Sequence, residues 1–253
     1  MRLRILGCDG GIGEELHTTA FLLDDDVLID AGTGVAQLTG PALGKINHVF
    51  LTHSHVDHTA YLPLLVDATV RRDHPLTVYA TEETLEVIKD HIFNWEIWPD
   101  FTQIPSTHQP VLRYRPIELG RPVEVGSGHI TAVPAKHTVP AVGYWLDSGT
   151  ASLVFSGDTT RCDALWEVVN GIENLKHLII ETAFGNADSS MAELCGHLCP
   201  QILFEELDKL ERDAEIFITH IKPRAHHEVM EQIVEQGVAL SPKRLMQDQI
   251  IEF

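Results

Sequence analysis

Residues 46–58 read INHVFLTHSHVDH, a short apolar run followed at once by a cluster of imidazole and carboxylate side chains. The apolar run is typical of a buried strand, and the apolar spacing over residues 60–70 is typical of a helix. The polar cluster therefore lies on a turn at the end of a strand, where side chains have a rigid support. The four potential metal ligands on this turn are His53, His55, Asp57 and His58.

A tight turn can aim alternate side chains at one point. We expect His53 and His55 to share one metal while Asp57 and His58 face a second, since imidazole suits zinc and carboxylate also accommodates iron or manganese. The alternative is a polar loop in which Ser54 or Asp57 caps the following helix. Three imidazoles around a carboxylate have no evident stabilising purpose without a metal, so the pattern favours a metal site.

Three later segments repeat this placement of a polar residue after an apolar run. His137 follows ITAVPAK, Asp158 follows SLVFSG, and His220 follows AEIFIT. Taken singly, a histidine at such a position is more often a core-edge or solvated residue than a ligand. Their occurrence together with the turn at 53–58 extends the predicted cluster to seven ligands.

The composition is that of a globular protein and limits the possible partners. The chain has 253 residues, of which 44% are hydrophobic and 22% charged, so it can supply a large core. We expect a single domain over residues 1–253. The formal net charge of -19 disfavours binding through a phosphate backbone, which requires Lys and Arg to displace counterions. Long nucleic acids and anionic membranes are therefore poor candidates.

Cysteine usage and the N-terminus predict a cytoplasmic location. The four cysteines contain no C-x-x-C pair and are too few for a disulfide scaffold, so reduced thiols are expected. The chain reaches Gly7 and Asp9 before the apolar segment of a signal peptide or membrane span can form. A homodimer is the general expectation, because dimers are the commonest soluble assemblies.

Strand and helix patterns alternate along the rest of the chain. Residues 93–116 are rich in Pro and aromatic residues without clear periodicity and are predicted to form a long loop. Gly10, Gly11 and Gly13 resemble a phosphate-binding loop only superficially, because no Lys-Ser or Lys-Thr follows, and we interpret them as a flexible turn. Strands are predicted at 2–6, 20–30 (as a hairpin around 24–26), 76–80, 129–134, 142–146, 151–155, 177–181 and 214–219, and helices at 81–92, 162–170, 199–211 and 225–236.

The order H-x-H-x-D-H, then His, then Asp in SGDT, then His resembles the metallo-β-lactamase superfamily over residues 5–220. The resemblance implies the metallo-β-lactamase fold, an α+β four-layer αβ/βα sandwich with two divalent metals at one edge, zinc or else manganese or iron. It also implies the ligands: His53, His55 and His137 for the first metal, Asp57, His58 and His220 for the second, and Asp158 as the bridge.

Such a site activates water. Two metals about 3.5 to 4 Å apart clamp the attacking and leaving oxygens of a phosphoryl displacement and lower the pKa of bound water to about 7. Asp57 is expected to orient the resulting hydroxide as well as to bind metal. Asp30 in LIDAGTG is either a carboxylate that orients a ligand imidazole or a turn residue at a strand end, and both interpretations stay open.

Residues 181–200, ETAFGNADSSMAELCGHLCP, resemble the segment after the bridging Asp in phosphodiesterase branches of the superfamily, including ribonuclease Z. The resemblance implies that Glu181 and His197 form a proton-donating dyad. An alkoxide leaving group needs a proton, and a histidine held protonated by a carboxylate can provide it. The alternative is an exposed histidine near a helix start.

Residues 91–101, HIFNWEIWPDF, and GHLCP followed by ITHIKP at 218–223 resemble class II cyclic-nucleotide phosphodiesterases. The implied reaction is hydrolysis of a 3',5'-cyclic nucleotide, cAMP or cGMP, to the 5'-monophosphate, so that the partner is a small phosphodiester. The 21-position step from His137 to Asp158 leaves no room for the Gly-rich arm with which many ribonuclease Z proteins grip tRNA. The alternatives are a ribonuclease Z-like RNA phosphodiesterase and another hydrolase of this fold, such as a β-lactamase or thioesterase.

Other residues near these segments are weaker candidates. Trp95 and Trp98 are expected to pack more readily than to stack on a base. Lys136, Lys222 and Arg224 lie beside site segments and are candidates for phosphate contacts, although a solvated surface charge is the default for such residues.

Overall fold

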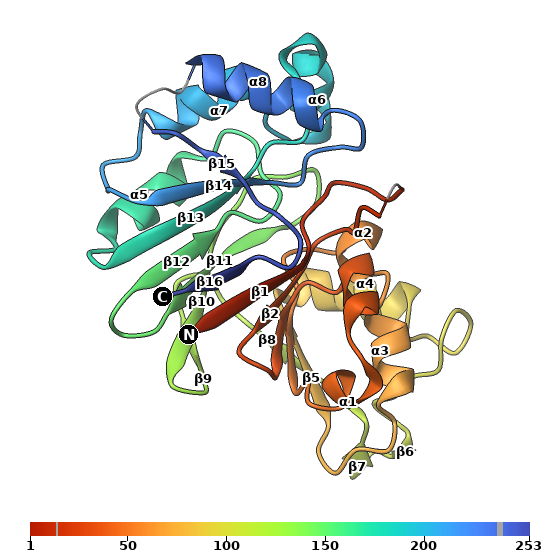
Figure 1. The fold of residues 1–253 in the computed structure, drawn as a ribbon. Helices are drawn as coiled ribbons and strands as arrows, with labels where there is room; N and C mark the ends of the chain where they lie inside the picture. The colour runs from red at the N-terminus through yellow and green to blue at the C-terminus, as the bar shows by residue number, and fades with distance from the viewer. Residues whose placement is uncertain (14, 237–239) are drawn as a thin grey trace.

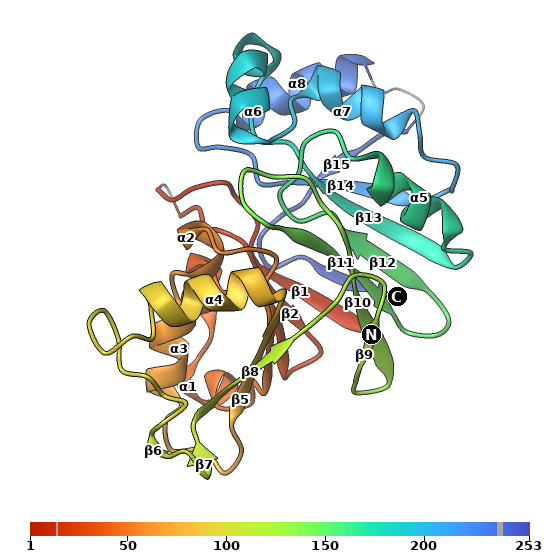
Figure 2. The same ribbon diagram turned by 180° about the vertical axis from the view of Figure 1, so that it is seen from behind.

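The computed structural model describes residues 1–13, 15–236 and 240–253. Two mixed seven-stranded sheets face each other, and helices cover the outer face of each, as Figure 1 and the reverse view in Figure 2 show. The α+β four-layer αβ/βα sandwich predicted from the sequence is confirmed. In both views the two chain ends lie side by side, where the last strand joins the first.

The first sheet is built mainly from the N-terminal half of the chain, in the order β16-β1-β2-β3-β4-β5-β8. Its strands from β3 to β8 are parallel, and β16, β1, β2 and β3 are antiparallel neighbours. The strands are β1 (Arg2–Gly7), β2 (Ala20–Leu23), β3 (Val27–Ile29), β4 (His48–Phe50), β5 (Leu76–Ala80), β8 (Leu112–Pro116) and β16 (Ile250–Glu252).

The second sheet comes from the C-terminal half, in the order β15-β14-β13-β12-β11-β10-β9. The strands from β12 to β15 are parallel, so their carboxyl ends meet at one edge. The strands are β9 (Pro122–Val125), β10 (Gly128–Pro134), β11 (Val142–Asp147), β12 (Ser152–Phe155), β13 (Leu175–Glu181), β14 (Glu215–Thr219) and β15 (Lys243–Arg244).

The helices divide between the two outer faces, those of the first half against the first sheet and those of the second half against the second (Figure 2). None of the helices in the described ranges is long and apolar enough to cross a membrane. The helices are η1 (Thr33–Gln37), α1 (Gly40–Leu43), α2 (Val56–Thr59), α3 (Leu62–Ala68) and α4 (Glu82–His91) on one side, and α5 (Asp163–Gly171), η2 (Asn186–Asp188), α6 (Ser189–Cys195), α7 (Pro200–Leu207) and α8 (His226–Gln236) on the other.

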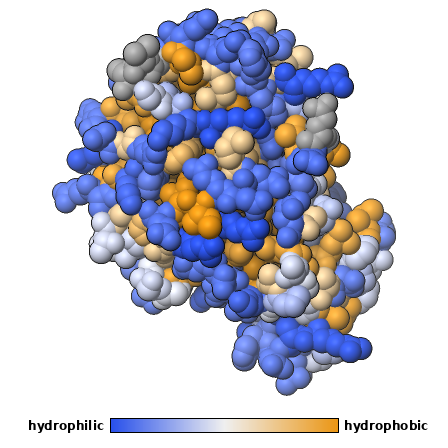
Figure 3. Space-filling view, viewed as in Figure 1, coloured by the Kyte–Doolittle hydropathy of each residue, from blue (hydrophilic) through white to orange (hydrophobic). Residues whose placement is uncertain are grey.

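Three hydrophobic clusters fill the spaces between the four layers. In β2, Phe21 and Leu23 face the opposite sheet, while Ala20 and Leu22 face the helices. Both faces of this strand are buried, which is why it is a continuous apolar run rather than an alternating one. Between the sheets, the rings of Phe21 and Phe155 meet edge to face at 4.9 Å. On the surface in Figure 3, hydrophilic side chains predominate and hydrophobic ones are scattered among them.

Most predicted elements are present, and one prediction is wrong. Residues 93–116 are not an unbroken loop, because they contain the hairpin β6 (Pro105–Ser106) and β7 (Gln109–Pro110) and the strand β8. β8 lies at the edge of the first sheet. In it, Leu112 is buried, while Arg113 and Arg115 are exposed. Such a polar edge strand gives a weak apolar signal. Strands β9, β15 and β16 and helix α6 were also missed for lack of a long periodic run.

Candidate metal centre

The predicted ligands follow four different strands and meet at one edge of the sandwich. The turn at 53–58 follows β4, His137 follows β10, Asp158 follows β12, and His220 follows β14. The ligand turn continues directly into the short helix α2, whose first turn carries Asp57 and whose last turn carries His58. His55 is the N-cap residue, and no side chain caps this helix, so the capping loop considered from the sequence is not formed.

The first group of three consists of histidines. The ligand atoms of His53, His55 and His137 lie within 4.8 Å of one another. His137 Nε2 is 3.1 Å from His55 Nδ1, and the ring centroids of His53 and His137 are 5.0 Å apart. This is the set that the family resemblance implied for the first metal.

The second group also matches the implied set. Ligand atoms of Asp57, His58 and His220 lie within 4.8 Å of one another, and His220 Nε2 is 3.7 Å from Asp57 Oδ2. His220 has a backbone φ of 62°, in the left-handed region that a residue with a side chain enters at a cost of about 1–3 kcal/mol. The surrounding structure holds this conformation, since His220 N donates to Cys8 O at 2.8 Å.

Asp158 lies between the two groups. Its Oδ2 atom is 3.3 Å from the Nε2 atoms of His58 and His220, 3.7 Å from His53 Nε2 and 3.9 Å from His137 Nε2. It therefore reaches both histidines of the second group and two of the first. This is the position that a bridging carboxylate requires.

The buried polar atoms of this cluster fit a divalent metal. Within the described ranges, His53 Nε2, His58 Nε2 and both carboxylate oxygens of Asp158 are buried without a hydrogen-bond partner. Buried polar groups without partners are costly and rare in folded proteins. Imidazole and carboxylate are ligands that zinc, manganese and iron accept.

The pKa shifts of three of these side chains favour the same interpretation, and that of His58 runs the other way. Burial lowers the pKa of His58, but Asp158 and Asp30 outweigh it and raise the pKa well above its usual range. Burial lowers the pKa of His53 well below its usual range, and burial lowers the pKa of His220 to about 3. Burial alone would raise the pKa of Asp158, but the facing histidines His220 and His58 hold it well below the usual value. Neutral imidazoles and an ionised carboxylate are the forms in which these side chains bind metals.

Groups outside the ligand set hold the imidazoles in place. Asp30 Oδ2 is 2.7 Å from His58 Nδ1, so Asp30 has the orienting role that was one of its two interpretations. Thr52 Oγ1 is 2.9 Å from His53 Nδ1, and Gly196 O accepts from His137 Nδ1 at 2.9 Å. Sequence reasoning missed the last two groups.

Glu181 and His197 form a buried pair beside the centre. Glu181 Oε1 is 2.7 Å from His197 Nδ1, and the carboxylate also accepts from the backbone of Thr159 and Leu198. Burial lowers the pKa of His197, but Glu181 outweighs it and the pKa is raised overall. His197 is 6% exposed, so it is not a surface histidine. Its ring also lies within ligand distance of His137 and Asp158.

The weaker candidates from the sequence differ in whether they lie near the predicted metal centre. Lys222 Nζ lies 3.3 Å from His220 Nε2, whereas Arg224 is exposed. Trp98 packs against the cluster beneath the first group of helices, and Trp95 is 59% exposed. The packing role expected of these aromatic residues therefore holds for Trp98.

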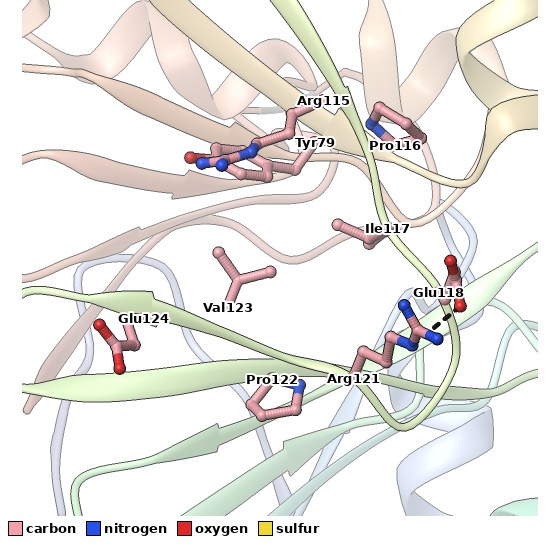
Figure 4. Close-up of a pocket in the computed structure, with 9 residues that line it drawn as sticks. All are labelled: Tyr79, Arg115, Pro116, Ile117, Glu118, Arg121, Pro122, Val123 and Glu124. Atoms are coloured by element: carbon pink, nitrogen blue, oxygen red, sulfur yellow. Dashed lines mark ion pairs between the residues drawn. The ribbon is translucent and has the colours of Figure 1, made fainter.

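Cavities lie both beside the centre and away from it. One of about 940 Å³ is lined by His137 and Lys136 and by the acidic residues Glu82, Glu83 and Glu118. A smaller one of about 330 Å³ is lined by Ser54 and again by Glu83. A third, of about 490 Å³, lies between β5, β8 and β9, includes the ion pair of Glu118 with Arg121 (Figure 4) and contains no predicted ligand.

Comparisons with known proteins identify the family of this chain. Residues 25–244 match the model of the beta-lactamase superfamily domain, and the chain belongs to the metallo-β-lactamase superfamily. A probable 3',5'-cyclic-nucleotide phosphodiesterase of Yersinia pestis is 27% identical over 86% of this chain and 77% of its own length. A ribonuclease Z of Mycobacterium bovis is 28% identical over 60% of this chain and 59% of its own length.

Solved structures share the fold. Unliganded yeast PDE1 superimposes with a TM-score of 0.83 at 17% identity, covering 100% of this chain and 99% of that one. The chain thus belongs to the metallo-β-lactamase-fold hydrolase family and has phosphodiesterase homologues, and its His and Asp cluster is suited to metal binding.

Proposed function

We propose that this chain is a single-domain, metal-dependent phosphodiesterase that hydrolyses 3',5'-cyclic nucleotides, cAMP or cGMP, to 5'-monophosphates. The observation that carries the proposal is the buried pair of Glu181 and His197 beside the ligand cluster, with a 2.7 Å contact between them. A proton donor at this place serves the departure of an alkoxide, which a phosphodiester releases.

In this proposal seven side chains hold two divalent ions, zinc or else manganese or iron. When bound, the ions supply a water of lowered pKa and positive charge for the phosphate oxygens. His53, His55 and His137 would hold the first ion, Asp57, His58 and His220 would hold the second, and Asp158 would serve both.

The remaining steps belong to side chains of the protein. Asp57 is 29% exposed at its side chain, so it can accept a hydrogen bond from the attacking water and orient it. Glu181 holds Nδ1 of His197, which leaves Nε2 to give a proton to the ribose 3'-oxygen as it departs. Because Glu181 raises the pKa of His197 against the effect of burial, the imidazole retains the proton it must donate.

The acidic cavities beside the centre favour a small substrate over a polyanion. Glu83 lines both the cavity next to His137 and the one next to Ser54. Carboxylates accept hydrogen bonds from ribose hydroxyls and base amino groups but repel further phosphates. With a net charge of -19, this arrangement supports a single phosphodiester rather than long RNA. The Yersinia pestis relative supports the same substrate class.

The test is hydrolysis of cAMP and cGMP alongside bis-p-nitrophenyl phosphate. The assay compares three preparations: wild type, Asp158→Ala, and metal-stripped protein with zinc or manganese restored. We expect metal-dependent turnover of the cyclic nucleotide that Asp158→Ala abolishes. Cleavage of the activated diester alone would retain the metal centre and reject cyclic nucleotides as substrates.

The second candidate is a ribonuclease Z-like RNA phosphodiesterase, which the Mycobacterium bovis relative favours. Gel-resolved cleavage of a tRNA precursor by the metal-loaded protein, at the same enzyme concentration as the cAMP assay, separates the two. Specific tRNA cleavage without cAMP turnover would replace the first proposal.

A further inference from the structure

Lys222 brings an ammonium group to the edge of the metal centre. The side chain is half-buried, and its Nζ atom lies 3.0 Å from Gly10 O and 3.3 Å from His220 Nε2. Its backbone N–H donates to Ala183 O at 3.0 Å, in the segment that follows Glu181 at the end of β13. Lys222 is therefore fixed at both ends and does not have the solvated position that is the default for a lysine.

The glycine-rich turn near the N-terminus explains how the ammonium is held. A Cβ atom at Gly10 would meet the backbone carbonyl of His220 and come within 3.0 Å of Lys222 Cδ, and one at Gly11 would lie 2.7 Å from Pro223 Cγ. The two residues without side chains let the turn pack directly on the segment 220–223. Close approach is what places Gly10 O against the ammonium group.

Hydrogen bonds of Gly10 and Asp9 hold the glycine-rich turn in place. Gly10 N donates to Ile221 O at 2.9 Å, and the neighbouring Asp9 is buried, with Oδ1 2.6 Å from His226 Nε2 and 3.3 Å from Arg244 Nη2. These contacts fix the backbone that carries Gly10 O. Because this backbone is held in place, the acceptor of the Lys222 ammonium has a fixed position.

The hydrogen bonds of this ammonium change when metal binds. A lysine ammonium has three donors, and in the described part of the chain its acceptors are Gly10 O and His220 Nε2. A metal bound at His220 Nε2 would occupy the lone pair that accepts from Lys222. The ammonium would then have two donors without a protein acceptor among the described residues, at the edge of the predicted metal centre.

We propose that Lys222 is a substrate-binding residue whose ammonium group donates hydrogen bonds to a non-bridging oxygen of the bound phosphate. The inference rests on the proposed phosphodiesterase function and names a phosphate contact for it. A charge-assisted hydrogen bond of this kind is among the stronger polar contacts in proteins.

Two separate measurements test the role of Lys222, the affinity for inorganic phosphate and the rate of phosphodiester hydrolysis. Inorganic phosphate is titrated calorimetrically into metal-loaded wild type, Lys222→Met and Lys222→Arg, and metal content is measured on each. Lys222→Met, which retains the length of the side chain, is expected to weaken phosphate binding and to lower kcat/KM for bis-p-nitrophenyl phosphate about 10- to 150-fold, with unchanged metal content. Lys222→Arg is expected to recover part of both.

The matched control is Lys45→Met, which removes the same charge from an exposed ion pair with Asp25 before the start of β4. It should bind phosphate as wild type does. Three outcomes would each overturn the inference. They are wild-type phosphate affinity in Lys222→Met, a loss of metal in that variant, and no phosphate binding by metal-loaded wild type. If wild type hydrolyses no phosphodiester, the proposed function fails, and the phosphate titration still decides the role of Lys222.

Discussion

His58 Nδ1 lies 2.7 Å from Asp30 Oδ2, and both side chains are completely buried. Asp30 also accepts from the backbone N–H of Thr52 at 2.7 Å and from its hydroxyl at 2.8 Å. The Thr52 hydroxyl in turn lies 2.9 Å from His53 Nδ1. One buried carboxylate is therefore connected to a histidine of each ligand group, directly in one case and through a hydroxyl in the other.

Asp30→Asn should weaken metal binding without unfolding the protein. The amide can still accept from Thr52, but it loses the charge that orients the His58 imidazole. Replacement of such an outer partner typically costs about 10- to 100-fold in metal affinity. Competition with a chelator, followed by metal analysis, measures the affinity, and circular dichroism checks the fold. Wild-type affinity in a folded Asp30→Asn protein would contradict the orienting role.

Thr52→Val should affect mainly the first ligand group. Valine keeps the shape of threonine but removes the hydroxyl between Asp30 and His53, while the direct contact of Asp30 with His58 remains. We expect weaker binding of one metal equivalent and near-normal binding of the other, measured by stepwise metal titration. Thr52→Ser keeps the hydroxyl and is the control. Equal titrations for valine and serine would exclude a role for the hydroxyl.

The Glu181–His197 pair should be needed most when the leaving group is poor. His197→Gln is expected to slow cAMP hydrolysis about 10²- to 10⁴-fold, because an alkoxide cannot depart readily without a proton. Bis-p-nitrophenyl phosphate should be much less affected, since its leaving group is stable as an anion. The ratio of the two rates is the measurement.

Metal content separates this role from ligation, because His197 also lies within ligand distance of His137 and Asp158. A proton donor leaves the metal content of His197→Gln at the wild-type level. A drop in metal content together with equal losses on both substrates would show instead that His197 is a ligand. Glu181→Gln should reproduce the His197→Gln rate ratio more weakly.

Asp147 should contribute stability that disappears in acid. Burial raises its pKa, but hydrogen bonds from Gly149 N, Asn174 and Ser152 outweigh this and lower it below 3.8. A folded-state pKa below the unfolded value stabilises the fold above the unfolded pKa, and this stabilisation is lost as pH falls through the folded pKa.

The measurement is the free energy of unfolding of wild type and Asp147→Asn by urea at several pH values. The difference should be constant above about pH 5 and should shrink at lower pH, where the carboxylate takes up a proton. A difference that does not change between pH 3 and pH 7 would exclude this linkage.

Most strands and the cluster of predicted ligands were accessible from short local patterns in the sequence. The layered arrangement was implied by the resemblance to the metallo-β-lactamase superfamily and did not follow from those patterns. Strands such as β4 and β14 are apolar runs, and each ends at a polar residue, so the chain order of the predicted ligands could be read directly. The edge strand β8 was not accessible in this way, since Arg113 and Arg115 interrupt its apolar pattern.

The tertiary structure alone decided which distant groups contact the predicted ligands. Gly196 has a φ of 71° at the end of α6, and its carbonyl meets His137, 59 positions away. Gly10 holds Lys222 across 212 positions. Sequence patterns report the local preference of strand and turn, whereas contacts at such separation depend on how two sheets pack, and packing is the sum of many weak interactions spread over the whole core.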